Sequence, residues 1–290
     1  MGEYQAVMMA PDASTSDALD LRILPEPDRV LKETSPVALW SQSALHCGRL
    51  LRRWGRDPLT IIQAVVYPVL FLLMLRTVLG NSVSSATGED SIFGSVPLIA
   101  MVAAMSGSLA SAIGLRREKA AGLVSRFQTL PVHRAAGLLG RLMAETARIV
   151  VTTTLIIAVG FLLGYRFDQG PVAGIIAMAV PLAFGLGFAV FVTSAAIVTT
   201  TFPIVEVVGM VFTILMFFNS GFVPTRAYPT WLQPFIEHNP ISCAVDAMKG
   251  LTLGGPVASP LIQAMLWSVG LFVVFLVPAV RGYRSAAAAS

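Results

Sequence analysis

The sequence predicts an all-α membrane protein with six transmembrane helices, preceded by an amphipathic helix at the membrane surface. Of the 290 residues, 55% are hydrophobic and only 12% are charged, about half the roughly 25% charged content of a typical soluble domain. The apolar residues form charge-free runs that can each hold a membrane span, which takes about 20 residues. Basic residues cluster between these runs. A conventional soluble protein is therefore excluded.

The N-terminal segment, residues 1–35, is rich in Asp, Glu, Ser and Pro. This composition predicts a mostly disordered cytoplasmic tail. The segment has no apolar core of a cleaved signal peptide. The two cysteines, Cys47 and Cys243, cannot define a disulfide framework.

Residues 36–57 predict the amphipathic interfacial helix. Ser35 and Pro36 suit a helix start, as cap and first residue, and Asp57-Pro58 ends the helix. Its apolar residues recur at steps of three and four, with the arginines largely off that stripe. They are Val37, Trp40, Ala44, Cys47, Leu51 and Trp54. The helix is either a simple membrane anchor or also a brace for an attached cytoplasmic subunit, and the pattern leaves both open.

Residues 58–284 predict the transmembrane domain of six helices. The expected spans are 59–79, 91–115, 143–165, 171–197, 204–221 and 260–280. The fourth and fifth share one long charge-free run. Thr199 to Pro203 divides them, because proline cannot continue the hydrogen-bond ladder of a helix.

The basic residues predict the orientation. Sixteen of the 20 fall in the segment before the first span, between spans two and three, or in the tail. Because cytoplasmic loops carry the excess of Lys and Arg, both termini should lie in the cytoplasm. We therefore expect a multi-pass protein of the bacterial cytoplasmic membrane. A net charge of +4 does not by itself suggest nucleic-acid binding.

The basic loop 116–141 joins spans two and three. Arg116 to Gln128 can form a helix, Leu130-Pro131 breaks it, and Val132 can start a second helix that leads into span three. From these residues alone, a loop that only sets topology is the simpler interpretation. A short helix that contacts a cytoplasmic partner is the alternative.

Motifs in this loop and after span five resemble those of ABC-2 type permeases. They are Arg117-Glu118-Lys119-Ala120-Ala121-Gly122-Leu123, Leu130-Pro131-Val132-His133-Arg134, Leu139-Gly140-Arg141, Phe218 to Pro224, Pro229 to Pro234, and Asn239-Pro240-Ile241 through Gly250. The resemblance covers roughly residues 36–284. It is closest to the daunorubicin/doxorubicin-resistance branch, and to the C-type subunit of sets with two permeases. It implies the ABC-2 (type V exporter-like) fold.

The resemblance implies that the loop is a coupling helix that sits in a groove of an ATPase subunit. The expected ATPase contacts match the motif, and its arginines would face acidic residues on that subunit. Phe127 and Leu130 would be apolar anchors. The full set is Arg117, Glu118, Gly122, Arg126, Phe127, Gln128, Leu130, Pro131, His133 and Arg134.

We do not expect this chain to bind a nucleotide. A P-loop needs a Gly-Lys pair, and the three lysines, Lys32, Lys119 and Lys249, follow Leu, Glu and Met. ATP and Mg are thus expected on a separate ATPase chain. The three histidines lie far apart and no His-Glu-x-x-His motif is present, so no metal or catalytic residue is expected.

Some polar and aromatic residues of the spans are candidates for a cargo path or gate. Glu206 lies early in span five, where a carboxylate should face protein or water; it is either a gate or a structural partner. Phe212, Met216, Phe217, Phe218 and Asn219 follow it, and could face cargo or simply pack. Glu145 and Arg148 are expected at the interface.

The outer segment 222–258 contains five prolines and four aromatic residues. By resemblance it forms short re-entrant helices. Asp246 and Lys249, three residues apart, could pair on one helix face.

The resemblance, together with these features, implies a permease subunit of an ATP-driven ABC exporter. By resemblance, its partners are ATPase subunits and a second homologous permease, with membrane lipids around it. Its cargo is hydrophobic or amphipathic: a complex envelope lipid such as phthiocerol dimycocerosate, anthracycline-type drugs, or both. The alternatives are export of another polyketide or polysaccharide-lipid cargo, and a secondary drug transporter.

Overall fold

A computed structural model describes residues 35–88, 90–122, 133, 135–198 and 203–288. Within these ranges the regular structure is helical, with no strand. The predicted tail, residues 1–35, lies outside them except for its last residue. The all-α fold class is thus confirmed for the part of the chain that is described.

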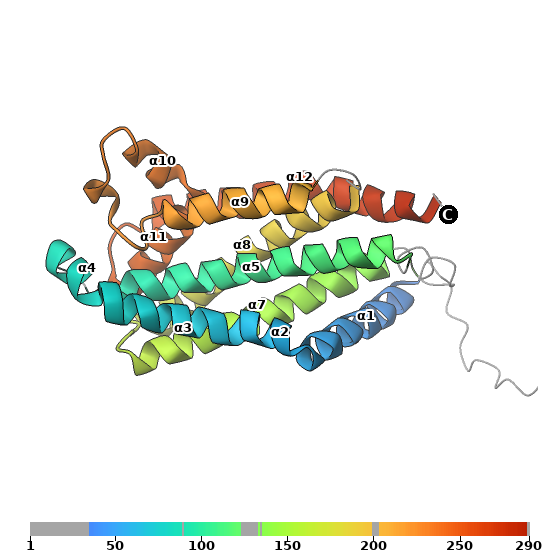
Figure 1. Cartoon of the computed structure of the whole chain (residues 1–290), viewed down its shortest axis with the longest axis horizontal. Coiled ribbons are helices and arrows are strands. Elements are labelled where there is room, and N and C mark those ends of the chain that lie inside the picture. The colour runs from blue at the N-terminus through green and yellow to red at the C-terminus, as the bar shows by residue number, and fades with distance from the viewer. Residues whose placement is uncertain (1–34, 89, 123–132, 134, 199–202, 289–290) are drawn as a thin grey trace, which may run out of the picture. The chain divides into compact units, whose positions relative to one another are not determined.

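Four long helices run side by side (Figure 1): α5 (Ile92–Ala120), α7 (Ala136–Leu162), α8 (Pro171–Val198) and α12 (Ala258–Ala288). Each contains a stretch long and apolar enough to cross a membrane, which in α12 is Ala258–Gly282. The apolar stretch Ile62–Val78 and α9 (Ile204–Phe217) are shorter. Four of the six expected spans therefore meet the length criterion, and the count of six stays a prediction.

The first expected span is a series of helical segments. They are α2 (Pro58–Ile61), the π-helix η2 (Ile62–Val66), α3 (Tyr67–Met74), the π-helix η3 (Leu75–Leu79) and α4 (Gly80–Thr87). The residues at the joins keep helical dihedral angles. Pro68 follows the first π turn, and a proline has no N–H and crowds the carbonyl four residues earlier. The widened π turn is a recognised way to relieve that conflict within a helix.

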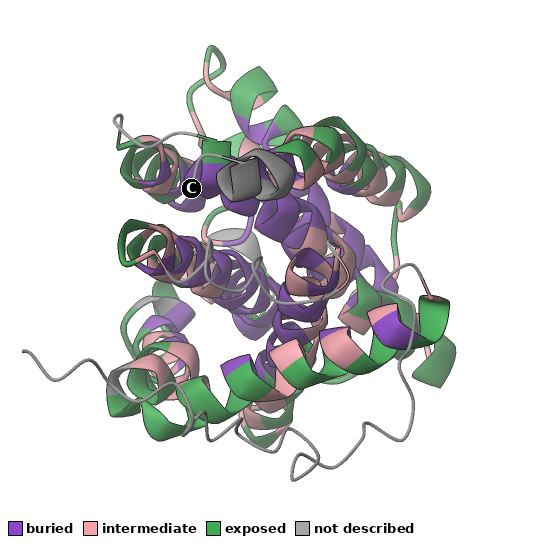
Figure 2. Cartoon of the chain, turned by 90° about the vertical axis from the view of Figure 1, so that its right-hand side faces the viewer, coloured by how far each residue is buried: buried purple, intermediate pink, exposed green. Residues whose placement is uncertain are grey.

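The core lies where the long helices face one another, as the end-on view in Figure 2 shows. Small residues mark the closest approaches. Gly187 of α8 lies against the backbone of Ser268 in α12, and Gly185 lies against Ile149 and Ala104. This is the close packing that small residues permit between membrane helices.

The expected amphipathic helix is α1 (Pro36–Arg56), and it packs along the start of α7. Gly140 of α7 marks the crossing: a Cβ there would lie 2.6 Å from Cβ of His46 and 2.7 Å from the Ser43 carbonyl oxygen. Ser35 occupies the N-cap position, but its side chain makes no capping hydrogen bond. The expected stripe points largely outward, with Val37 and Trp40 exposed.

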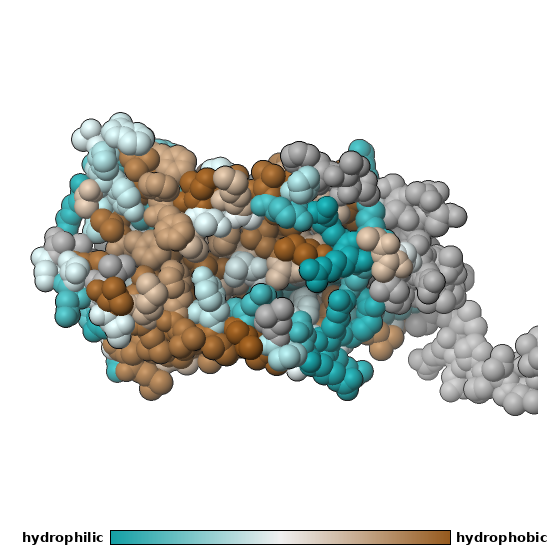
Figure 3. All heavy atoms as spheres, in the orientation of Figure 1, coloured by the Kyte–Doolittle hydropathy of each residue, from teal (hydrophilic) through white to brown (hydrophobic). Residues whose placement is uncertain are grey.

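We call the end where α5 stops and α7 starts the basic end of the bundle. Figure 3 shows hydrophilic side chains gathered there and apolar side chains over the middle. The opposite end carries η4 (Thr225–Ala227), α10 (Gln233–His238) and α11 (Pro240–Leu253). Within residues 222–258 the chain thus forms short helices, as the resemblance implies, and their placement on the outer side stays a prediction.

Asn239 joins two helices at this opposite end. Its Nδ2 donates to the carbonyl of Leu215 in the last turn of α9 (2.9 Å), while its Oδ1 accepts from the N–H of Ile241 in α11 (2.9 Å). One side chain therefore satisfies a free carbonyl and a free amide, the groups that helix ends leave unpaired.

Asp246 and Lys249 meet at Ser220 rather than pairing with each other. Oγ of Ser220 donates to Asp246 at 2.7 Å, and Nζ of Lys249 donates to the Ser220 carbonyl at 3.4 Å. Burial raises the pKa of the Asp246 carboxyl, against the opposing effect of the Ser220 hydroxyl and Lys249. The expected direct ion pair between Asp246 and Lys249 is therefore not formed.

Candidate functional site

The last turn of α5 carries four consecutive charged residues, Arg116 to Lys119, at the basic end. The helix ends just after them: the N–H of Gly122 bonds the Lys119 carbonyl, and Gly122 has φ +70°, the left-handed conformation that glycine adopts most easily. Because successive helix residues are rotated by about 100°, these four side chains point toward different neighbours.

Glu118 connects α5 to two other helices. Its carboxylate accepts from Arg53 of α1 and, at 3.0 Å, from Arg141 of α7. Arg141 also donates to the carbonyl and hydroxyl oxygens of Ser111, at 3.0 and 2.9 Å. Glu118 and Arg141 are buried, whereas 57% of the Arg53 side chain is exposed. The Glu118–Arg141 pair is therefore the stronger of the two contacts, since exposed pairs contribute little.

Arg116 and Lys119 extend the same turn to two more helices. Nη1 of Arg116 lies 2.8 and 2.5 Å from the two carboxylate oxygens of Glu206 in α9. Lys119 donates to the carbonyl of Ile197 in the last turn of α8, where a cation is favourable. We call Arg116, Glu118 and Lys119 the α5 hub. It joins the end of α5 to α1, α7, α8 and α9.

A second polar cluster lies farther from the basic end. Arg148 of α7 donates to Glu145 at 2.6 Å, to Ser108 at 3.2 Å, and to two carbonyls of α5. A Cβ at Gly107 would collide with its guanidinium, so the absence of a side chain there makes room for it. Both Glu145 and Arg148 are buried between α5 and α7. Their expected depth at the membrane interface stays a prediction.

Four of the expected ATPase-contact residues are described. Arg117 is exposed, Gly122 is partly exposed, and Glu118 is buried in the hub. The N–H of His133 donates to Oε1 of Gln42 in α1 at 2.6 Å, so the loop returns to α7 against α1. Arg126, Phe127, Gln128, Leu130, Pro131 and Arg134 lie outside the described residues.

The expected start of a separate loop helix at Arg116 is wrong, because Arg116 to Ala120 continue α5. In the sequence, the charges of Arg116 and Glu118 indicate a loop. In the structure they form ion pairs with Glu206 and Arg141, and the helix therefore continues through them.

The residues expected on a cargo path do not share one surface. Phe212 and Met216 are buried, whereas Phe217 and Phe218 are exposed. Asn219 is fully buried. Its side-chain Nδ2 donates to the Met216 carbonyl, and its Oδ1 accepts from the Gly221 N–H. Glu206 pairs with Arg116, as the structural alternative expects.

Sequence reasoning missed Arg53, Ser111 and Arg141 as members of the site. Arg141 stood in a family motif near the start of a span, and that was a usable signal. Arg53 and Ser111 offered none, because their partners lie 65 and 30 residues away.

The model of the ABC-2 type transporter family matches residues 43–253. This chain belongs to the ABC-2 type transporter family. Its relatives include a protein of Mycobacterium tuberculosis named "Probable doxorubicin resistance ABC transporter permease protein DrrC", 44% identical over 246 residues, which cover 85% of this chain and 89% of the relative. Another is "Daunorubicin resistance ABC transporter permease protein DrrB1" of Streptomyces coeruleorubidus, 28% identical over 84% of this chain and 87% of the relative.

The α5 hub lies within the part of the chain that the family model matches. The part matched by the ABC-2 family model begins within α1 and ends with α11, so it contains the hub and every partner of the hub. Proteins of this family are membrane transport proteins, in agreement with the apolar helices.

Proposed function

We propose that this chain is the permease subunit of an ATP-driven exporter that moves hydrophobic or amphipathic cargo out of the cytoplasmic membrane. The α5 hub carries this proposal. A turn that is tied by charged side chains to four other helices is suited to pass a displacement of the adjoining loop into the membrane domain. The exposed Arg117 stands beside it as a point of contact for a partner.

The energy source is a separate ATPase chain that holds ATP and Mg. The sequence offers no Gly-Lys pair for a P-loop. In this proposal the ATPase contacts the exposed residues of the loop 116–141. Glu118 acts as a positioning residue, because its carboxylate is already engaged by Arg53 and Arg141.

The names of the two relatives support cargo of the anthracycline type. A complex envelope lipid such as phthiocerol dimycocerosate belongs to the same amphipathic class, and we include it in the proposal. A second, homologous permease completes the path, as the naming of relatives as DrrB and DrrC suggests. Both termini face the cytoplasm, and α1 lies in the inner interface.

Transport by the assembled complex tests the proposal. The chain is co-expressed with an ATPase and a second permease of the same family from its own host, and ATP-dependent doxorubicin uptake is measured in inverted membrane vesicles. Uptake should need ATP and all three chains, and should stop when the P-loop lysine of the ATPase is replaced by alanine. Uptake that persists without ATP but follows a proton gradient would instead support a secondary transporter.

A parallel measurement addresses the lipid cargo. Deleting the gene for this chain in its own host should reduce the envelope lipids recovered outside the cytoplasmic membrane, without reducing their synthesis. Normal lipid export together with lost doxorubicin uptake would restrict the cargo to drugs.

A further inference from the structure

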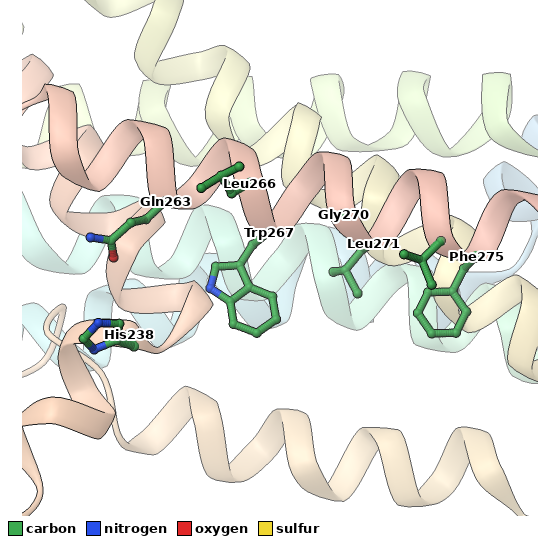
Figure 4. A pocket seen from close by; sticks show the side chains of 8 residues that line it. His238, Gln263, Leu266, Trp267, Gly270, Leu271 and Phe275 are labelled. Carbon is green, nitrogen blue, oxygen red and sulfur yellow. The ribbon is translucent and has the colours of Figure 1, made fainter.

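An apolar groove with a volume of about 620 Å³ runs along α12 near α10. Figure 4 shows its lining side chains projecting from α12 on one side, with His238 of α10 at one end. The residues that matter below are His238, Gln263, Trp267, Gly270, Leu271 and Phe275. None of them belongs to the hub or to its partners.

The groove is polar at one end and apolar along the rest. His238 and Gln263 lie at the same end in Figure 4, and Trp267, Leu271 and Phe275 follow along α12. An indole beside a polar end is the arrangement found where hydrocarbon meets the headgroup region of a membrane. This graded lining fits an amphiphile with one aliphatic chain.

The length of the groove matches one leaflet. Gln263 and Phe275 are twelve residues apart, which in a helix is about 18 Å. One leaflet contributes roughly 15 Å of hydrocarbon. Spread over that length, 620 Å³ gives a mean cross-section of about 35 Å², less than half that of a helix about 10 Å wide. The space therefore suits a chain rather than a helix.

The polar end presents hydrogen-bond acceptors. Nδ1 of His238 lies 2.8 Å from the Pro234 carbonyl, which can only accept, so Nδ1 carries the proton. In the neutral ring, Nε2 is then an acceptor. Oε1 of Gln263 already accepts from the thiol of Cys243 at 3.2 Å and keeps a second lone pair. A headgroup with an ammonium or hydroxyl donor is complementary to this end.

We propose that this groove binds one acyl chain of a phosphatidylethanolamine, with the ammonium at His238 and Gln263. The lipid belongs to the leaflet on the α10 side, which is the outer leaflet in the orientation given under the proposed function, on which that part rests. The lipid is a resident ligand, separate from the exported cargo. Gly270 provides the room, because a Cβ there would find no atom within 4 Å. A larger side chain at this position can thus fill the groove without disturbing the helices behind it.

Photocrosslinking tests the site in the complex of the full chain with its partners. The complex is reconstituted in phosphatidylcholine nanodiscs that contain phosphatidylethanolamine with a diazirine in its acyl chain, and labelled peptides are located by mass spectrometry. Label should concentrate between Gln263 and Phe275. Gly270→Trp should lower it roughly tenfold, since excluding two methylenes costs about that factor in affinity. Val273→Trp, at an exposed α12 residue outside the lining set, should not.

Two further measurements separate the alternatives. A diazirine phosphatidylcholine, which has no headgroup donor, should label the groove less than phosphatidylethanolamine, and His238→Ala should remove that difference. Equal labelling of the Gly270→Trp and Val273→Trp variants would overturn the proposal and leave only ordinary lipid contact. Efficient crosslinking of Leu266→Cys, labelled with benzophenone maleimide, to the second permease or to another copy of this chain would also overturn it, in favour of a second chain. Equal melting temperatures confirm that both tryptophan variants are folded.

Discussion

At the scale of single residues, the basic end separates two kinds of charge. Glu118 is buried and holds helices together, whereas its neighbour Arg117 points outward. Removing one member of a buried ion pair leaves the other charge unsatisfied, which is costly. Changing an exposed charge alters stability little. Substitution of Glu118 should therefore lower the stability of the permease, whereas substitution of Arg117 should affect only its contact with a partner.

Replacing Glu118 by glutamine should destabilise the permease by about 2–4 kcal/mol, because Arg141 loses its buried counter-charge. The melting temperature of the purified chain in detergent should fall by on the order of 5 °C. Arg117→Gln should leave it unchanged and weaken co-purification of the ATPase. An unchanged melting temperature in the Glu118→Gln variant would contradict the positioning role.

Gly107→Ala should also destabilise the chain, by about 1–3 kcal/mol, because the new methyl collides with a guanidinium fixed by several hydrogen bonds. The effect follows from the position of Arg148 beside Gly107. Gly114→Ala is the matched control on the same helix, since a Cβ there meets nothing within 4 Å. Helix propensity predicts that the control is neutral or stabilising, by up to about 1 kcal/mol. Equal melting temperatures would disprove the close contact.

At the scale of the helices, α5 is joined through its hub to α1, α7, α8 and α9 at the basic end. Its ion pair with α9, Arg116–Glu206, is partly exposed, with 54% of the Glu206 side chain accessible. Such a pair contributes no more than about 1 kcal/mol. A large effect of Glu206 on transport would therefore indicate a role beyond stability.

The exchange Arg116→Glu with Glu206→Arg tests that role. If the contact between α5 and α9 is what matters, each single change should reduce doxorubicin uptake, and the double exchange should restore most of it. If the carboxylate itself gates the path, the double exchange should remain as defective as Glu206→Arg. Melting temperatures should differ little among the four proteins.

Packing of α1 on α7 depends on Gly140. A valine there would push on the backbone of α1 at Ser43, and α1 should separate from α7. Gln42 is close enough to residue 133 for its Oε1 to accept from the His133 N–H at 2.6 Å. A crosslink by a short bismaleimide between cysteines placed at Gln42 and His133 should form in the parent chain and be lost in the Gly140→Val variant. Gly48→Val is the control, because Gly48 has open space around it. Crosslinking retained in both would refute the tight crossing.

The order of the helices follows from local pattern. The expected span 171–197 agrees with Pro171–Val198 within one residue, since a proline opens it and charge-free sequence fills it. The expected span 143–165 begins seven residues after the observed start of α7 at Ala136, because the charge of Arg141 indicates a loop residue. A hydropathy pattern treats every charged residue as exposed to solvent. It cannot show that Arg141 is buried, because Glu118 and Ser111, which bond to Arg141, are distant in the sequence. The hub could not be predicted for the same reason.

At the scale of the whole described chain, α5 is longer than a bilayer is thick. Its 29 residues span about 43 Å, against a hydrocarbon core of about 30 Å. One end must therefore reach beyond the hydrocarbon. We therefore expect the charged hub at the end of α5 and the short helices η4 and α10 at the opposite end to lie on opposite sides of the membrane.

Labelling of single cysteines tests that arrangement and its sidedness. In a chain with Cys47 and Cys243 replaced by serine, Ala121→Cys marks the basic end and Thr230→Cys the opposite end, both at exposed residues. A membrane-impermeant maleimide should label Thr230→Cys in intact cells and Ala121→Cys only after permeabilisation, because basic loops stay in the cytoplasm. The reverse labelling pattern would mean that the orientation in the membrane is inverted, and that a cytoplasmic ATPase cannot reach the hub. Labelling of both cysteines in intact cells would mean that α5 does not cross the membrane.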